Sequence, residues 1–348
     1  EIASIQCLSR REDFNAYPYK INLQNVVYDL EHFTPEEHNA DYKFTYVNPY
    51  KYDPEATCPL TDKILEQYAM GDKQWIDAFW ELAGFCLQEP YSFNKMAWWV
   101  GDGANGKSTC QRLLQALVGD ALTKTGFQVA QLNKEFFLTS VIGKRLALCG
   151  DAAVKMDNID LLKQYTGGDS METNVKYGDY EKVKVSAKLI LCMNRPPFVS
   201  SHELMKPIVR RILWFPFDFK IKQPDPTIES RMLSELPGIF NKAVAGLKRL
   251  RAQGRFSRVD RGEKQLMMWS GNANLFESFI TEHLVLDPEA ASWTDELWEG
   301  YRKFMDEWGG LYWERESHNV TNKKYFDTKL RERLSDVVFE KEMRNKIM

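Results

Sequence analysis

One stretch of the sequence, Met96 to Cys110 (MAWWVGDGANGKSTC), constrains the fold more than any other. It begins with Ala97 to Val100, an apolar run typical of a buried strand, and continues directly into the pattern G-x-x-x-x-G-K-[ST] with every fixed position occupied. A helical pattern over 111–118 follows, and Gly119 marks its end. Because strand, glycine-rich loop and helix occur in this order, we predict a nucleoside triphosphate site.

Each residue type in this loop has a physical reason. Glycines let the backbone turn tightly and direct consecutive N–H groups inward, where they meet the positive end of the helix dipole. We expect Lys107 to reach the β- and γ-phosphates and the Ser108 hydroxyl to bind Mg²⁺. The alternative is a glycine turn followed by a solvated lysine, which the ordered motif disfavours. The predicted nucleotide-binding residues are Gly101, Asp102, Gly103, Ala104, Asn105, Gly106, Lys107, Ser108 and Thr109.

Composition limits the classes of protein that remain. A chain of 348 residues is too long for one core and indicates about two or three domains. Its net charge of −3 provides no global basic field, although a few lysines in a channel could still bind DNA. The six cysteines include no C-x-x-C pair, which indicates reduced thiols, an intracellular protein and no zinc site. We find no membrane span or signal peptide and expect a cytoplasmic protein, and the start at Glu1 without Met suggests a piece of a longer polypeptide.

Two further apolar runs end in polar residues that suit a triphosphate site. The run over 144–151 ends at Asp151, the Walker B arrangement that places a carboxylate beside the metal, although an ordinary strand-end turn is the alternative. The run over 188–197 passes through Asn194, whose amide can orient water against a γ-phosphate. Arg210 and Arg211 then precede a last apolar strand, as surface residues or as donors to a neighbour's nucleotide.

Residues 171–188 predict a β-hairpin with Gly178 and Asp179 as its two-residue turn. Lysines that meet phosphates and aromatic rings that stack on bases would make it a contact for nucleic acid. An ordinary solvated hairpin is the alternative, because apolar and polar positions mix on its faces. The predicted DNA-binding residues are Lys176, Tyr177, Lys182 and Lys184.

The flanking regions have patterns of their own. Residues 1–55 alternate apolar and polar positions and predict a small β-rich region, with 44–46 as one strand candidate. From Pro59 the period becomes helical. Thr61 is a candidate cap for a first helix, and the aromatic stripe of a second helix, 72–88, suits either core or a subunit collar. A weak strand is expected at 125–129 and a helix at 134–141. The tail, 263–348, predicts three helices and a strand at 337–339, a winged-helix-like pattern that serves contacts with DNA or with protein.

Taken together, the order of these motifs resembles that of the superfamily 3 helicases, and most of all the primase-helicases of phages, satellite phages, plasmids and poxviruses. The stretches that carry the resemblance include GDGANGKST, Lys163-x-x-Thr-Gly-Gly-Asp169, Asn194-x-Pro and the Arg-Arg-Ile before the last strand, and it covers roughly residues 20–265. The resemblance implies an α/β fold: an AAA+-like P-loop ATPase core with a central parallel sheet at 93–262. A β-rich region at 1–55 and a helical collar at 56–92 would precede this core, and a winged-helix-like α-helical tail would follow from 263 to 348.

The same resemblance implies a homo-hexameric ring around single-stranded DNA that uses ATP and Mg²⁺, with nucleotide between subunits. Lys107 and Ser108 would bind phosphates and Mg²⁺, Asn194 would be the sensor, and Arg211 (or Arg210) would be the arginine finger. The hairpin around Lys176 would grip DNA, and a primase or polymerase domain would precede this segment. One departure leaves the general base open: the family commonly has two acidic residues or an Asn-Glu pair at Walker B, whereas here Gly150 precedes Asp151.

We therefore predict an ATP-dependent DNA helicase of a phage or other mobile element, acting in the host cytoplasm. The alternative is an ATP-dependent replication initiator or loader that binds DNA with little unwinding. A small-molecule P-loop kinase is a third reading, which the sensor Asn194, the paired arginines and the additional modules disfavour.

Overall fold

The computed structural model describes residues 13–133, 137–150, 152, 159–168, 170–174, 180–197, 207–271, 276, 279–280, 283–284, 292–308 and 323–334. The chain divides into two compact units, Glu1–Met267 and Met268–Met348. This division and the boundary predicted after residue 262 both fall within helix α9 (Asp260–Gly271). Within the described ranges, no helix is long and apolar enough to cross a membrane.

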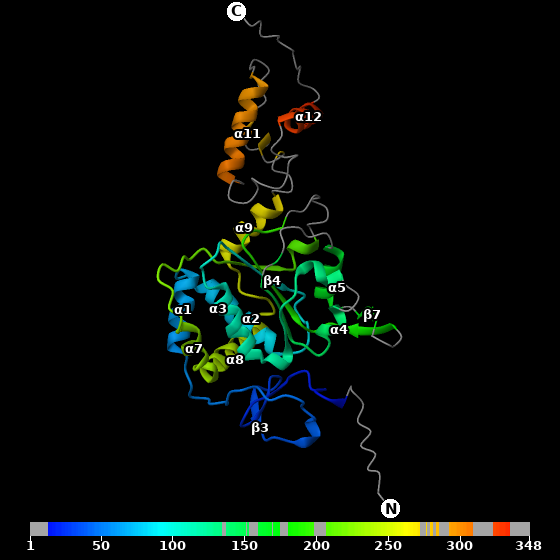
Figure 1. Ribbon diagram of the computed structural model, residues 1–348, viewed down its shortest axis with the longest axis vertical. Helices are drawn as coiled ribbons and strands as arrows, with labels where there is room; N and C mark the ends of the chain where they lie inside the picture. Colours follow the sequence, from blue (N-terminus) through cyan, green and yellow to red (C-terminus); the bar gives the residue numbers. More distant parts are fainter. Residues whose placement is uncertain are drawn as a thin grey trace, which may run out of the picture. The chain divides into compact units, whose positions relative to one another are not determined.

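A five-stranded parallel sheet forms the core of the first unit (Figure 1). Every residue of β4 and β9 is buried, as expected for strands of a parallel sheet that is covered on both faces. The predicted α/β class with a central parallel sheet is thereby confirmed. In spatial order the strands are β10 (Ile212–Pro216), β4 (Met96–Val100), β9 (Lys188–Met193), β6 (Leu146–Cys149) and β5 (Thr123–Lys124).

A group of helices lies on one side of this unit in Figure 1. The second of them carries the aromatic stripe noted in the sequence. Its Trp75 is fully buried, with ring centroids 5.5 Å from Phe215 and 5.3 Å from Phe217 of the segment that includes β10. The stripe is therefore core. The helices of this group are α1 (Pro59–Ala69), α2 (Lys73–Leu87), α3 (Lys107–Val118), α7 (Ile228–Leu233) and α8 (Leu236–Gln253).

Helices α2 and α8 approach closely because each has a glycine at the contact. A Cβ on Gly84 would lie 2.2 Å from the carbonyl oxygen of Ala243, and one on Gly246 would lie 2.2 Å from that of Trp80. Any larger residue at these two positions would push the helices apart, so the two glycines fix the spacing between α2 and α8.

The beginning of α1 differs from the prediction. The helix starts at Pro59, and Thr61 is no cap, since it lies buried inside the first turn. Glu235 accepts hydrogen bonds from the backbone N–H groups of Leu60 (3.0 Å) and Thr61 (2.8 Å) and from the Thr61 hydroxyl. A carboxylate distant in sequence thus does the work expected of a local cap.

Two short helices, α4 (Phe137–Val141) and α5 (Ile159–Gly167), contact strand β7 (Ser170–Asn174), which pairs with β8 (Tyr180–Lys184) as an antiparallel hairpin. The hairpin is confirmed, but its register places Asn174 opposite Tyr180, which differs from that of a two-residue turn at Gly178–Asp179. The turn itself lies outside the described residues.

The prediction of a strand at 125–129 is wrong. The chain forms β5 earlier and then a 3₁₀ helix, η4 (Val129–Asn133), while η3 (Asp120–Leu122) precedes β5. Of the helix predicted over 134–141, the part from Phe137 is present as α4, and residues 134–136 lie outside the described ranges.

The N-terminal segment forms a separate three-stranded antiparallel sheet. It is held against the core by the buried Arg145, whose guanidinium donates to the carbonyl oxygens of Lys20 (2.9 Å), Tyr17 (3.2 Å) and Leu87. The strand expected at 44–46 is absent, because Phe44 and Tyr46 lie in an irregular segment where their rings pack 5.5 Å apart. The elements here are β1 (Lys20–Asn22), β2 (Val27–Asp29), β3 (Thr34–Glu36) and η2 (Ala40–Tyr42).

The second unit has a small aromatic core of its own. Helices α11 (Thr294–Trp308) and α12 (Lys323–Arg333) correspond to two of the three helices predicted for the tail. The strand predicted at 337–339 lies outside the described residues. The buried residues that form the core are Phe276, Phe279, Ile280, Tyr301, Phe304, Phe326 and Leu330.

Candidate functional site

The glycine-rich loop joins the end of β4 to the start of α3. Gly106 immediately precedes the helix with φ of 90°, in the left-handed region that favours glycine. A Cβ at this position would lie 2.4 Å from the ring of Tyr68, which packs against the loop. Gly106 is therefore required both by the backbone conformation and by the close approach of α1. No sequence motif indicates this contact between Tyr68 and the loop.

Lys107, the first residue of α3, is buried, and its amine is held by oxygens of the loop itself. Nζ donates to the carbonyl oxygen of Gly101 and to Oδ1 of Asn105 at 3.0 Å. Desolvation by burial lowers the pKa of Lys107, while the nearby Cys192 and Asp102 act in the opposite direction. A triphosphate entering the loop would offer this amine anionic oxygens in place of neutral ones.

Asn105 has a positioning role that the motif did not predict. Its side chain is buried, and Nδ2 donates to the carbonyl oxygen of Phe217 at 2.8 Å while Oδ1 accepts from Lys107. The loop is held a second time by the backbone N–H of Ile221, which donates to the carbonyl oxygen of Ala104 at 2.9 Å. The segment that follows β10 therefore fixes the shape of the phosphate loop.

The outer rim of the loop is open to solvent, at Asp102, Gly103, Ala104 and Ser108. Its helix N-cap is a glycine, so no side chain occupies the first N–H groups of α3. These N–H groups lie beside the buried Lys107 amine and the exposed Ser108 hydroxyl, a set of donors suited to an anion.

The carboxyl ends of β4, β6 and β9 meet beside this loop. Gln111 of α3 donates from Nε2 to the carbonyl oxygen of Cys149, the last residue of β6, at 3.4 Å. After Gly150, the backbone N–H of Ala152 donates to the carbonyl oxygen of Cys192 at 2.8 Å. The Walker B candidate Asp151 stands between Gly150 and Ala152 in the sequence and lies outside the described residues. Sequence reasoning missed Gln111, which no motif singles out.

Binding of Mg²⁺ at this site would depend on the two predicted ligands, Ser108 and Asp151. Ser108 supplies an exposed hydroxyl oxygen, and the carboxylate of Asp151 would be the second hard oxygen ligand, a donor set that suits Mg²⁺. In the part of the chain that the structure describes, no group of three or more His, Cys, Asp or Glu residues could hold a metal ion.

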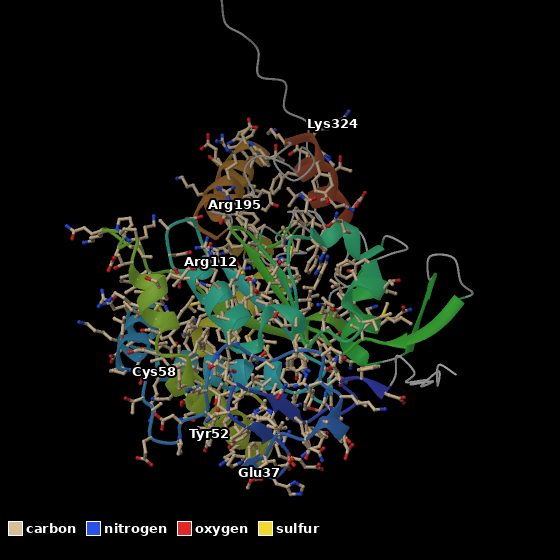
Figure 2. All side chains as sticks on the ribbon, turned by 60° about the horizontal axis from the view of Figure 1, so that its bottom comes forward. Glu37, Tyr52, Cys58, Arg112, Arg195 and Lys324 are labelled. Carbon is tan, nitrogen blue, oxygen red and sulfur yellow. The ribbon has the colours of Figure 1, made fainter. Side chains whose placement is uncertain are left out.

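Asn194 directly follows β9, and its side chain is exposed. The residue before it, Met193, accepts a hydrogen bond from the backbone N–H of Gly101 at 3.2 Å. The predicted sensor is therefore one residue from a direct contact with the start of the phosphate loop. Arg195 comes next and is also exposed; Figure 2 places it and Arg112 on the side of the first unit away from Tyr52 and Glu37.

Arg210 and Arg211 lie at the opposite edge of the same sheet. Residue 212 begins β10 in register with Met96, the first residue of β4, and the backbone N–H of Met96 donates to the carbonyl oxygen of Arg211 at 2.8 Å. Arg211 is half-buried, and Nη1 donates to the carbonyl oxygen of Pro207 at 2.9 Å, whereas Arg210 is exposed. The length of β4, about 3.3 Å per residue, separates both arginines from the loop of their own chain by roughly 15 Å.

The candidate DNA-binding residues fall on the hairpin. The register places Lys182 opposite Glu172 and Lys184 opposite Ser170, on one strand and two residues apart. Lys176 and Tyr177 lie outside the described residues, so their roles stay predictions.

The fold and this loop define an α/β protein with a phosphate-binding-loop motif at the carboxyl edge of a parallel sheet. Two family models match parts of the chain: "D5 N terminal like" over residues 1–69 and "Family of unknown function (DUF5906)" over residues 99–211. No curated protein matches the sequence.

Solved structures share the fold at low sequence identity. The A form apo structure of the NrS-1 C terminal region is 14% identical, with 78% of this chain and 68% of that chain covered and a TM-score of 0.52. The apo structure of the NrS-1 C terminal region (305–718) is 13% identical, with 92% and 74% covered and a TM-score of 0.52. The two family matches each cover less than half of the chain, and the solved structures show a shared fold.

Proposed function

We propose that this chain is an ATP-dependent DNA helicase that translocates on single-stranded DNA during replication of a phage or other mobile element, as the helicase part of a larger primase-helicase. The observation that carries the proposal is the phosphate loop with its buried Lys107 amine, placed where three strand ends and Asn194 converge. The substrate is ATP, and the cofactor is Mg²⁺. The protein would act in the host cytoplasm.

The arrangement of the sheet supports an AAA+-like core. The strands that lead into the phosphate loop, into Asn194 and toward Asp151 are neighbours, in the order β4, β9, β6. We assign 93–262 to this core and 263–348 to a winged-helix-like tail. Residues 56–92 would form a collar through the exposed face of α1, because the aromatic stripe of α2 is already buried.

In this proposal each residue of the site has one task. The loop N–H groups and Lys107 bind the β- and γ-phosphates, Ser108 and Asp151 hold Mg²⁺, and Asn194 orients the attacking water. Bound Mg²⁺ would neutralise charge on the β- and γ-oxygens.

The positions of the two arginines support a site shared between subunits. Neither can reach the loop of its own chain, so a finger at this edge must act on the nucleotide of another copy, as in a homo-hexameric ring. Arg210, which is exposed, is better placed for this than Arg211, whose guanidinium already donates to Pro207.

The test is ATP hydrolysis with and without single-stranded DNA, together with strand separation of a forked duplex. We expect hydrolysis to be stimulated by DNA and to fall by at least about 100-fold in Lys107→Ala, since removal of one phosphate ligand costs on that order. Lys51→Ala, at an exposed lysine of the N-terminal segment, is the matched control and should keep wild-type turnover. Wild-type turnover in a folded Lys107→Ala variant would overturn the proposal.

The same assays separate the alternative function. Hydrolysis without stimulation by DNA, and without strand separation, would favour an initiator or loader whose ATP binding drives assembly. For the helicase, Lys176→Ala should weaken binding to single strands and reduce the slope of log affinity against log salt by about 0.7, one lost phosphate contact.

A further inference from the structure

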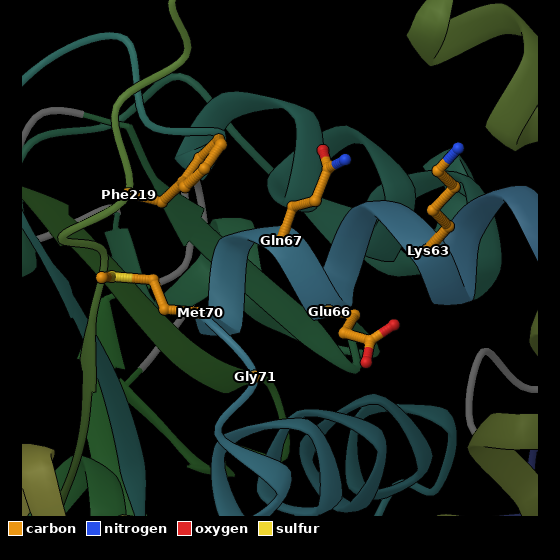
Figure 3. A pocket seen from close by; sticks show the side chains of 6 residues that line it. All are labelled: Lys63, Glu66, Gln67, Met70, Gly71 and Phe219. Carbon is orange, nitrogen blue, oxygen red and sulfur yellow. The ribbon is translucent and has the colours of Figure 1, made fainter.

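A shallow pocket of about 520 Å³ lies at the carboxyl end of α1, within the volume range of small-molecule sites (Figure 3). Two structural elements form it: the last two turns of α1 and the segment that follows β10. In Figure 3, Gln67 and Lys63 extend from α1 in the same direction, and Phe219 approaches from the other segment. The lining residues are Lys63, Glu66, Gln67, Met70, Gly71 and Phe219.

Tyr68 of α1 and the segment after β10 connect the walls of this pocket to the phosphate loop. Tyr68, between Gln67 and Met70 on α1, lies against Gly106, and its ring centroid is 6.0 Å from that of Phe219. Burial raises the pKa of Tyr68, and a hydrogen bond with Thr109, in the first turn of α3, acts in the opposite direction. Two residues beyond Phe219, the N–H of Ile221 donates to the loop at Ala104. A ligand with its phosphates in the loop therefore has this pocket as its neighbour.

Arg261 holds the two walls of the pocket together. Its Nη2 donates to the carbonyl oxygen of Ala69 at 2.8 Å, and its Nε lies 3.2 Å from the Asp72 carboxylate, both at the turn between α1 and α2. Nη1 lies 3.4 Å from Asp218, the residue before Phe219. Because one guanidinium contacts both walls, the spacing between Met70 and Phe219 is built into the fold.

Met70 occupies a position at which glycine is the usual residue. The backbone N–H of Gly71 donates to Glu66 and that of Met70 to Gln67, which is the Schellman arrangement at the end of a helix. Met70 has φ of 56°, in the left-handed region, and its side chain is 58% exposed. A large apolar side chain is thus held in a strained conformation in contact with solvent, the pattern expected where a side chain serves a ligand.

We propose that this pocket binds the base of the nucleoside triphosphate, and that the base is adenine. Phe219 and Met70 provide apolar surface against the faces of the ring, and sulfur and aromatic groups both pack well on such faces. Gln67 provides an amide that can donate to and accept from the adenine edge, the pairing that glutamine makes with adenine. This inference rests on the proposed binding of a triphosphate at the loop.

The experiment compares ATP, GTP and inorganic tripolyphosphate by calorimetric titration of the intact chain. Wild type should bind ATP more tightly than GTP and tripolyphosphate. Phe219→Ala should weaken ATP binding about tenfold, the loss expected from about 1.4 kcal/mol of stacking, and should leave tripolyphosphate binding unchanged. Val47→Ala, which removes an exposed apolar side chain from the N-terminal segment, is the control and should change neither.

A second variant separates ligand binding from folding. Met70→Gly relieves the left-handed strain, so it should keep or raise the urea midpoint while it weakens ATP binding. Unchanged ATP affinity in both Phe219→Ala and Met70→Gly would overturn the base assignment, and Lys107→Ala would still lose affinity for ATP and tripolyphosphate alike. If Lys107→Ala keeps its affinity for tripolyphosphate, the proposed triphosphate site itself is wrong.

Discussion

The two edges of the central sheet both carry cations and polar groups, but those groups are used in different ways. At the carboxyl edge, Lys107 and Asn105 are held by hydrogen bonds within the loop, beside the exposed Ser108. At the amino edge, several basic residues precede or begin the strands, and the following five show how such cations are used, most of them by binding backbone carbonyl groups. They are Lys95, Arg145, Lys188, Arg210 and Arg211.

Two of the amino-edge cations are structural. Arg145 donates to the carbonyl oxygen of Leu87, and Lys188 donates to those of Gln88 and Glu89, the latter at 2.7 Å. These oxygens belong to the carboxyl end of α2, where cations stabilise the helix dipole and unpaired carbonyl groups. A basic residue at this edge is thus no sign of catalysis by itself, and exposure separates Arg210 from the others.

The largest expected effect tests whether the amino edge of one molecule and the carboxyl edge of another molecule together form one ATP site. Arg210→Ala should lower ATP hydrolysis by about 10³-fold, the size typical of an arginine finger. Mixed with Lys107→Ala before nucleotide is added, it should regain part of the activity, since some interfaces pair an intact loop with an intact arginine. Arg211→Ala is tested in the same way to decide which arginine acts.

Arg195→Ala provides the matched control for that experiment. Arg195 lies at the carboxyl edge with Asn194, so any defect there falls on the same side of an interface as Lys107. A mixture of Arg195→Ala and Lys107→Ala should gain nothing beyond the activity of Arg195→Ala itself. If ATP hydrolysis recovers neither when Arg210→Ala nor when Arg211→Ala is mixed with Lys107→Ala, the site is not shared through the amino edge.

The next effect concerns the carboxyl edge alone. Asp151→Asn should keep ATP binding and lower hydrolysis by about 100-fold or more, because an amide neither accepts a proton nor binds Mg²⁺ well. Titration with ATP and a steady-state ATPase assay measure the two quantities separately. Persisting turnover would mean that another carboxylate close in the sequence acts in place of Asp151: Asp157, Asp160 or Asp169.

A smaller effect is expected at Asn105, which ties the loop to the end of β10. Asn105→Ala leaves the carbonyl oxygen of Phe217 without its donor and the Lys107 amine without one acceptor. We expect a loss of about 1–3 kcal/mol of unfolding free energy in urea, as for an unpaired buried group, and a raised KM for ATP. Unaltered stability and KM would show that the loop holds its shape without this side chain.

The last expected effect is a pH dependence at the amino edge, which changes stability and not catalysis. Burial lowers the pKa of Lys188 to about 7, whereas the unfolded chain keeps the ordinary value of 10.5. Between these two values the unfolded state binds more protons, so stability rises with pH, by at most about 1.4 kcal/mol per pH unit. Below pH 7 both states are protonated, and the slope due to this group vanishes.

Urea unfolding at pH 7, 8 and 9 measures that slope, with Lys188→Met as the variant that lacks the group. We expect the wild type to gain stability over this range relative to Lys188→Met. Lys51→Met, at an exposed lysine, should follow the wild type. Parallel curves for wild type and Lys188→Met would mean that the buried amine keeps an ordinary pKa.

The sequence by itself determined the features that depend on neighbouring residues. The strand, loop and helix of the phosphate site follow from apolar runs and glycine positions, and Asp72 caps α2 from directly before it, at 3.0 Å from the N–H of Gln74. Gly119 ends α3 with φ of 93°. In each case the deciding interaction is a backbone torsion or a hydrogen bond within a few residues, which a local pattern records.

Tertiary structure alone decided the features that join distant segments. Glu235 caps α1 across 175 residues, Tyr68 closes on Gly106, and Phe219 completes a pocket begun by α1. The parallel register of β4 and β10 puts Arg210 at the edge away from the loop. These contacts come from packing among elements that the chain brings together only on folding, so no spacing along the sequence predicts them.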